Sequence, residues 1–286
     1  MLEINSVSKS FKVKKKKGKS QPDAIDPREE GNTFHALKNV SFSTKRGTIT
    51  GLLGANGAGK TTLMRILGTS FKPTSGTVTI DGLDIVEDSM EIRKKIGFLS
   101  GTSGLYGRLS AKEIVSYFGR LYGIPANEIG DRVDQLFEDL DITKFAHRQV
   151  ENLSAGMKQR ISIARSLIHS ADLIIFDEPT TGLDVPSAQG ILNHIEICRD
   201  LNKSIIFSTH HMHEIDKLCD QIIIIQFGVV IFQGTVEAMR QASGHKHLDD
   251  AYLALTGQAL KMDYGINSVK NDVSLALSQQ SDNTNA

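Results

Sequence analysis

A glycine-rich segment, GANGAGKT at residues 54–61, constrains the fold of this chain more than any other feature. It matches the pattern G-x-x-x-x-G-K-[ST], follows the short apolar run Thr48–Leu53 and precedes the helix-forming run Thr62–Thr69. In such a strand–loop–helix unit the glycines let backbone N–H groups turn inward around phosphate oxygens, and the positive end of the helix adds attraction. The segment therefore predicts an α/β fold that binds nucleotide phosphates.

The positions within this segment have different expected roles. Lys60 can reach the β- and γ-phosphates of a nucleoside triphosphate, and the Thr61 hydroxyl can ligate Mg²⁺. The sequence thus predicts that the chain binds ATP with Mg²⁺. The residues expected to contact the nucleotide are Gly54, Asn56, Gly57, Ala58, Gly59, Lys60, Thr61 and Thr62.

Two adjacent carboxylates, Asp177 and Glu178, end the apolar run Leu173–Phe176. Ligands of an open parallel sheet bind at the carboxyl ends of its strands, so both side chains are expected beside the phosphates. Asp177 would anchor Mg²⁺, directly or through water. Glu178 would polarise the attacking water as a general base. An Asp-Glu pair by itself is usually only a strand end, but downstream of the glycine-rich segment it indicates catalysis.

A helix start at residues 152–157, NLSAGM, offers a further anion site. Ser154 is a favourable N-cap, and Gly156 lets a ligand approach the first helical turn. Alone, this pattern is an ordinary helix start. Together with the two preceding motifs it indicates a second helix end that binds an anion.

Hydrophobic periodicity predicts an alternation of strands and helices along the chain. Strands are expected at residues 2–12, 34–44, 48–53, 76–81, 172–176, 204–208 and, as two short strands around Gly228, 222–232. Helices are expected at 111–122, 126–140, 154–168 and 186–201. The most apolar stretch, 222–232, is shorter than the ~20 residues of a spanning helix, so we expect no membrane crossing by this chain itself.

Two regions lack such periodicity. Residues 14–32 begin with KKKKGKS, contain Pro22 and Pro27, and are expected to form a solvated loop, with contact to anionic lipid headgroups as the alternative. Beyond Gly257 the periodicity is lost again, and the polar end SQQSDNTNA is expected to be disordered.

Taken together, the motifs resemble those of the nucleotide-binding subunits of ABC transporters. LSAGM at 153–157 resembles the signature of that family, and DEPT at 177–180 resembles its second phosphate motif. TGLD at 181–184 resembles its D-loop, and STH at 208–210 resembles its switch-histidine motif. The four motifs follow the family's order and spacing, and the resemblance covers about residues 2–240.

The resemblance implies an α/β, ABC-type P-loop NTPase core within residues 1–240. That core has a mixed sheet flanked by helices and an antiparallel β subdomain. A helical subdomain at about 102–170 and a C-terminal extension over 241–286 complete the expected organisation. It further implies a head-to-tail homodimer in which ATP lies between Gly54–Thr61 of one subunit and Ser154–Gly156 of the other.

Several single residues take their expected roles only from this resemblance. His210 would contact the γ-phosphate and help to hold the attacking water, and Asp184 would belong to the nucleotide site. Phe11 would stack on adenine, with Phe34 as the alternative, because stacking needs only an aromatic face. One departure is that Gly101 stands where the family carries a glutamine that senses the metal.

The resemblance also implies a partner and a location. An ATP-hydrolysing subunit of this kind would sit at the cytoplasmic face of the cell membrane and drive transport through a separate membrane-spanning permease subunit. The run GTSGLYGRLSAKE at 101–113 resembles the same region in ABC subunits of sodium exporters. We therefore expect the transport to be export, with sodium ions as the substrate. The alternative is a soluble ABC-type ATPase that is not coupled to transport. The formal net charge is zero, and we expect no nucleic-acid partner.

Overall fold

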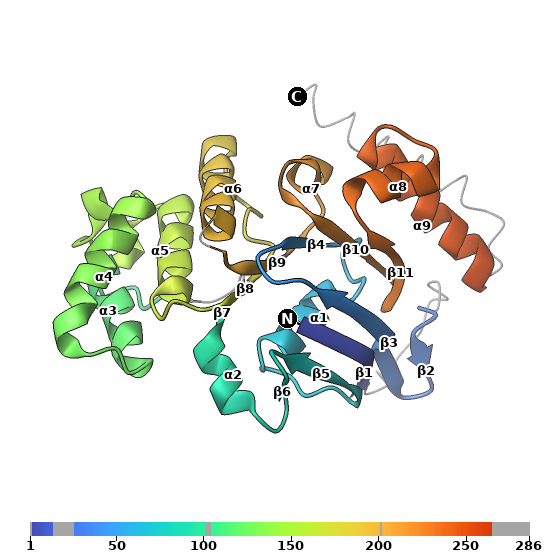
Figure 1. Cartoon of the computed structure of the whole chain (residues 1–286), viewed down its shortest axis with the longest axis horizontal. Helices are drawn as coiled ribbons and strands as arrows, with labels where there is room; N and C mark the ends of the chain where they lie inside the picture. The colour runs from blue at the N-terminus through green and yellow to red at the C-terminus, as the bar shows by residue number, and fades with distance from the viewer. Residues whose placement is uncertain (1, 14–25, 101–103, 201, 265–286) are drawn as a thin grey trace, which may run out of the picture. The chain divides into compact units, whose positions relative to one another are not determined.

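The computed structural model describes residues 2–13, 26–100, 104–200 and 202–264 of the chain. The described residues form two compact units, one up to Val236 and one from Glu237 onward. The first unit contains all the motifs discussed above. It holds two sheets with helices packed around them (Figure 1).

The larger sheet has six strands in the order β11-β10-β4-β9-β8-β7. Its strands are β4 (Ile49–Leu53), β7 (Ile96–Ser100), β8 (Leu173–Asp177), β9 (Ser204–Thr209), β10 (Gln221–Gln226) and β11 (Val229–Gly234). All neighbours pair in parallel except β11, which pairs antiparallel with β10. Every residue of β4 and β8 is buried, as expected for parallel strands covered on both faces. The expected mixed sheet is therefore confirmed.

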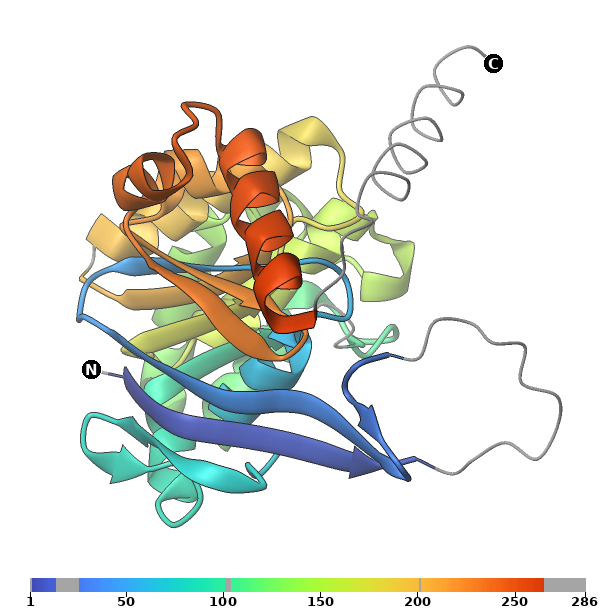
Figure 2. The ribbon, with the colours of Figure 1, turned by 90° about the vertical axis from the view of Figure 1, so that its right-hand side faces the viewer.

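The smaller sheet is antiparallel throughout, in the order β2-β3-β1-β5-β6. Its strands are β1 (Leu2–Lys12), β2 (Glu29–Glu30), β3 (Thr33–Thr44), β5 (Ser75–Ile80) and β6 (Leu83–Asp84). Figure 2 shows β1 and β3 running side by side over most of their length. This sheet is the expected antiparallel β subdomain.

One hydrophobic core joins the two sheets through helix α1 (Lys60–Leu67). Leu63, Met64, Ile66 and Leu67 of α1 are buried in it together with apolar side chains of β1, β3, β4 and β5. The helix that follows the glycine-rich segment is thus fixed at its sides by packing. Its N-terminal end is thereby held at the end of β4, where the predicted phosphate site begins.

The remaining helices of the first unit include the four that the periodicity predicts and two, at residues 89–95 and 212–218, that it does not predict. They are α2 (Ser89–Lys95), α3 (Ala111–Leu121), α4 (Ala126–Asp139), α5 (Ala155–Leu167), α6 (Val185–Asp200) and α7 (Met212–Leu218), with short 3₁₀ turns at Thr143–Phe145 and Val150–Asn152. Helices α3, α4 and α5 gather beyond β7 (Figure 1) and bury apolar side chains such as Ile114, Val133 and Ile161.

The expectation of a solvated loop over 14–32 is wrong for its last residues. Glu29 and Glu30 form β2, which pairs with Phe34 and Thr33 of β3 across a turn at Gly31. The N–H of His35 donates to the Arg28 carbonyl, which fixes the segment one step further back. These backbone hydrogen bonds outweigh the weak strand propensity of the charged sequence. Residues 14–25 lie outside the described residues.

The second unit contains α9 (Leu248–Tyr264), and α8 (Val236–Ser243) begins at the boundary. Helix α9 continues past Gly257, where the periodicity of the sequence is lost. A glycine inside a helix costs only about 1 kcal/mol relative to alanine, so its presence does not end the helix. Residues 265–286, including the end expected to be disordered, lie outside the described residues.

Candidate nucleotide-binding site

The glycine-rich segment forms the loop between β4 and α1 that the sequence predicts. Gly57 and Gly59 have φ angles of +81° and +117°, in the region that favours glycine. A Cβ atom on Gly59 would lie 2.8 Å from the Ala36 carbonyl oxygen of β3. The loop can therefore approach β3 this closely only because residue 59 has no side chain.

Lys60 lies inside this loop and is only 3% exposed. Its ammonium donates to the carbonyl oxygens of Gly54, at 2.6 Å, and Ala55, at 3.2 Å. It also lies 3.5 Å from Glu178 Oε1. The loop carbonyls thus hold the positive charge at the centre of the loop, where the N–H groups of α1 and a bound phosphate would meet.

Thr61, Asp177 and Ser208 meet at the carboxyl ends of β8 and β9. The Thr61 hydroxyl donates to Asp177 Oδ1 at 3.2 Å, and the Ser208 hydroxyl donates to the same oxygen at 2.8 Å. A hydroxyl and a carboxylate are the hard oxygen ligands that suit Mg²⁺. Within the described residues, no group of three or more His, Cys, Asp or Glu side chains could hold a metal ion. The hydroxyl and carboxylate oxygens of Thr61 and Asp177 fit an Mg²⁺ that binds with the nucleotide's phosphates.

Glu178 has an unusual backbone and a central position. Its φ angle is +50°, which is uncommon for a residue with a side chain. Its N–H donates to the Ser208 hydroxyl at 2.9 Å, and Thr181 Oγ1 donates to its Oε2 at 3.1 Å. Such outliers persist where the surroundings fix them, and they cluster at functional sites. The turn directs the carboxylate toward the glycine-rich loop.

His210 follows β9 and reaches the same carboxylate. Its Nδ1 lies 3.9 Å from Glu178 Oε1, and its ring packs against His211 with centroids 4.1 Å apart. Lys60, Glu178 and His210, far apart in the sequence, thus converge on one point in the fold. Ser208 contacts both carboxylate residues: its hydroxyl accepts from the Glu178 N–H and donates to Asp177. The sequence did not predict this role for Ser208.

The aromatic residue beside the glycine-rich loop is Phe34 and not Phe11. A pocket next to the loop is lined by Arg28, Phe34, Ala36, Asn56, Gly57, Gly59, Lys60, Thr61, Thr62 and Glu178. Phe11 instead packs edge-on against Phe71, with ring centroids 5.8 Å apart. The structure therefore places the alternative aromatic at the pocket.

Arg28 is a pocket residue for which the sequence contains no signal. Its guanidinium lies 4.7 Å from the Phe34 ring centroid and donates to the Gly57 carbonyl at 2.5 Å. Asp26 accepts two further hydrogen bonds from it, and this contact lowers the pKa of the Asp26 carboxyl. An arginine in a charged, non-periodic segment has no motif, and only the pairing of β2 with β3 brings it to the pocket.

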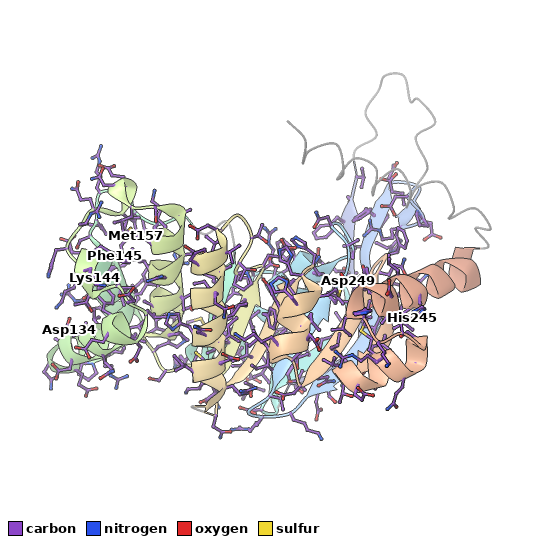
Figure 3. The ribbon with its side chains drawn as sticks, turned by 90° about the horizontal axis from the view of Figure 1, so that it is seen from above. Asp134, Lys144, Phe145, Met157, His245 and Asp249 are labelled. Carbon is purple, nitrogen blue, oxygen red and sulfur yellow. The ribbon has the colours of Figure 1, made fainter. Side chains whose placement is uncertain are left out.

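Ser154, Gly156 and Asp184 are absent from this pocket. Ser154 caps α5, with its hydroxyl accepting from the Met157 N–H at 3.3 Å, and a Cβ on Gly156 would meet Ser187 Oγ at 2.6 Å. Figure 3 shows Met157 on α5, in the helical region that also carries Lys144 and Phe145. Asp184 accepts a hydrogen bond from the Ser187 N–H, and its contacts with Ser187 lower its pKa.

The position of the missing glutamine stays untested. Gly101 lies outside the described residues. Ser100, the last residue of β7, stands opposite Asp177 in the parallel register of β7 and β8. The carboxyl end of β7 therefore lies directly beside the predicted metal site.

Replacement of Phe34 by alanine should weaken ATP binding more than the same change at Phe11. Loss of one base–aromatic stack costs about 1–3 kcal/mol, or roughly 5- to 150-fold in Kd. Because Phe11 lies against Phe71 and outside the pocket, we expect Phe11→Ala to change Kd by less than about 2-fold. Equilibrium binding of a fluorescent ATP analogue measures both. A larger loss of ATP affinity for Phe11→Ala than for Phe34→Ala would contradict this assignment and show that adenine stacks on Phe11.

Comparison with known proteins gives one consistent result. The family model described as ABC transporter matches residues 37–181. The ABC transporter ATP-binding protein NatA of Bacillus subtilis (strain 168) is 37% identical over 255 residues, which cover 89% of this chain and 97% of NatA. The linearmycin resistance ATP-binding protein LnrL of the same organism is 36% identical over 199 residues, 70% of this chain and 64% of LnrL.

Solved structures agree with this result. The structure of an ATP-binding subunit of an ABC transporter superimposes with a TM-score of 0.74 at 25% identity, over 89% of this chain and 99% of that one. The ATP-binding cassette MJ0796, in a dimeric post-hydrolysis state bound to ADP and Pi, superimposes with a TM-score of 0.71 at 26% identity, over 82% and 99%. The chain therefore shares its fold with these two ATP-binding structures.

Proposed function

This chain belongs to the ABC transporter family of ATP-binding, ATP-hydrolysing cassettes, and on that premise we propose that it drives transport through a separate membrane-spanning subunit. The convergence of Lys60, Asp177 and Glu178 at the ends of parallel strands beside the glycine-rich loop supports the hydrolysis that would drive this transport. Each of these residues has a distinct part in hydrolysis.

Binding and activation divide among few side chains. Lys60 and the loop N–H groups hold the β- and γ-phosphates, and Thr61 with Asp177 holds Mg²⁺. Mg²⁺ held there would supply positive charge that stabilises the phosphoryl group during its transfer. Glu178 orients the attacking water and accepts its proton, and His210 holds the γ-phosphate and the water in line. The 3.9 Å between His210 Nδ1 and Glu178 Oε1 supports this shared task.

A second copy of the chain completes the site in this proposal. Ser154 and Gly156 are exposed or partly exposed at the start of α5, and neither lines the pocket beside the glycine-rich loop of its own chain. A head-to-tail homodimer brings the α5 N-terminus of one copy onto the γ-phosphate held by the other. The dimeric state named for MJ0796 supports this arrangement.

We propose that the membrane-spanning partner binds to the exposed surface of α3 and of the segment just before it. Tyr106 and Leu121 are 58% and 62% exposed, Tyr117 is exposed as well, and a neighbouring pocket is lined by Phe98, Phe118, Tyr122 and Arg165 among others. Exposed apolar side chains gathered in this way indicate an interaction site. In the part of the chain that the structure describes, no helix is both long and apolar enough to span a bilayer. We propose a peripheral subunit at the cytoplasmic face.

Export is the direction we propose. The name of the relative LnrL refers to resistance, which supports movement of a compound out of the cell. The resemblance of residues 101–113 to sodium exporters makes the sodium ion the first substrate to test. These finer assignments depend on the membrane-spanning subunit, which carries the substrate path.

Purification from native membranes tests the proposed function. We expect the tagged chain to elute with a membrane-spanning protein, and Tyr117→Asp with Leu121→Asp to reduce the recovery of that partner at least about 10-fold, because each change puts a charge into an apolar contact. ATP binding should not change. Asn127→Asp, on the exposed face of α4, is the matched control and should keep the partner. Recovery of the parent chain only from the soluble fraction would contradict the proposal.

A further inference from the structure

A buried carboxylate outside the nucleotide pocket connects the two segments that carry the proposed catalytic side chains. Glu214, on α7, is 1% exposed, and within the described residues only it and Asp177 are buried acidic side chains. A buried carboxylate is unfavourable unless its oxygens receive hydrogen bonds. The partners of Glu214 therefore show what this side chain holds in place.

Each carboxylate oxygen of Glu214 accepts one hydroxyl hydrogen bond. Thr180 Oγ1 donates to Oε1 at 2.7 Å, and Thr209 Oγ1 donates to Oε2 at 2.5 Å. The Thr209 oxygen also accepts from the His211 N–H at 3.0 Å, which leaves its own proton for Glu214. Both threonines are buried. Hydrogen bonds to an ionised acceptor are short and strong, and here water does not compete with them.

The two threonines flank the catalytic candidates at neighbouring strand ends. Thr180 follows Glu178 by two residues in the turn after β8, and Thr209 immediately precedes His210 at the end of β9. Strands β8 and β9 pair in parallel with Asp177 opposite Ser208, so both ends face the same edge of the sheet. The Glu214 carboxylate spans from one of these ends to the other.

The turn that carries Glu178 needs an anchor on each side. Its φ angle of +50° is a conformation that relaxes unless the surroundings oppose it. The Ser208 hydroxyl fixes the Glu178 N–H before the turn. The hydrogen bond from Thr180 to Glu214 fixes the turn two residues later. Without the second anchor, the carboxylate of Glu178 could move away from Lys60 and His210.

We propose that Glu214 is a positioning residue for ATP hydrolysis. By accepting hydrogen bonds from Thr180 and Thr209, it holds the neighbouring residues Glu178 and His210 in their positions relative to each other. The inference rests on the roles proposed above for Glu178 and His210. Glu214 is not among the residues that line the pocket. It therefore acts on the rate of the chemical step and leaves the affinity for ATP unchanged.

Steady-state hydrolysis by the purified assembly of this chain and its membrane subunit tests the inference. We expect Glu214→Leu to lower kcat about 100-fold, the cost of a catalytic group misplaced by about 1 Å. Glu214→Gln should stay within about 5-fold of the parent, because its amide can accept from one threonine and donate to the other. The Kd for ATP should remain within about 2-fold for both variants, since the loop contacts are untouched.

Two further variants guard against a simple loss of folding. Thr180→Val removes one anchor at nearly constant volume, and we expect about a 10-fold lower kcat in a folded protein whose thermal midpoint falls because Glu214 Oε1 loses its donor. Glu196→Gln is the matched control, because Glu196, on α6, pairs at 3.8 Å with Lys217, which lies on α7 with Glu214, but it touches neither threonine. It should retain the parental kcat. A parental kcat in both Glu214→Leu and Thr180→Val would overturn the inference.

A combined variant separates this inference from the proposed function. If Glu214 acts through Glu178 and His210, adding Glu214→Leu to a variant that carries both Glu178→Gln and His210→Ala should lower the residual rate by less than about 2-fold. A further 100-fold loss would show an independent role and overturn the inference alone. A parental rate in Glu178→Gln itself would instead overturn the general-base assignment in the proposed function.

Discussion

Replacement of Glu178 by glutamine should abolish most ATP hydrolysis while ATP stays bound and the ATP-bound dimer accumulates. A general base contributes about 10²- to 10⁴-fold to a rate, and the glutamine amide cannot accept the proton of the attacking water. The amide keeps the size of the side chain and can still accept from Thr181. Single-turnover hydrolysis, ATP binding and size-exclusion chromatography with ATP measure the three effects.

The same substitution elsewhere provides the control. Glu91→Gln, on the exposed face of α2 in contact with Lys94, should hydrolyse ATP at the parental rate. Hydrolysis by Glu178→Gln at that rate would show that another group takes the proton. The carboxylate between Lys60 and His210 would then be structural.

Replacement of Lys60 by alanine should remove most of the affinity for ATP. Charge-assisted hydrogen bonds are worth about 1.5–3 kcal/mol each, so loss of one such bond from the ammonium should raise Kd roughly 10- to 150-fold. The carbonyl oxygens of Gly54 and Ala55 would also lose their donor, which should loosen the loop. Isothermal titration with ATP measures the affinity. Lys45→Ala, an exposed lysine after β3, is the control and should bind as the parent does.

Unchanged ATP affinity in Lys60→Ala would contradict the assignment of the glycine-rich loop. A thermal melt of the variant without nucleotide completes the measurement. We expect a folded protein, because the apolar side of α1, including Leu63, Met64 and Ile66, remains in the core.

Local patterns were sufficient to predict most of the fold. The buried strands β4 and β8 are mostly apolar, and the alternation of β3 shows which side of that strand is covered. The glycines at positions 57 and 59 predict the loop conformation, because both positions have positive φ angles, which favour glycine. Asp177 and Glu178 could be placed because strand ends of a parallel sheet meet at one edge.

The parts that the sequence did not predict depend on contacts between distant segments. Strand β2 exists because Glu29 and Glu30 find partners in β3, although neither residue favours a strand. Phe11 and Phe34 are equally aromatic, and only packing against Phe71 removes Phe11 from the pocket. The interior position of Glu214 follows from two threonine hydroxyls that lie 34 and 5 residues away in the chain.

Mixing two inactive variants tests most directly the central claim that ATP is hydrolysed between two copies of this chain. Lys60→Ala disables the loop, and Ser154→Asp keeps the α5 N-cap but places a negative charge toward the γ-phosphate. In a head-to-tail mixed dimer one site combines the intact loop of one chain with the intact Ser154 of the other. Half of randomly assorted dimers are mixed, so we predict recovery of about a quarter of the parental rate. No recovery in dimers shown to have exchanged subunits would contradict the account.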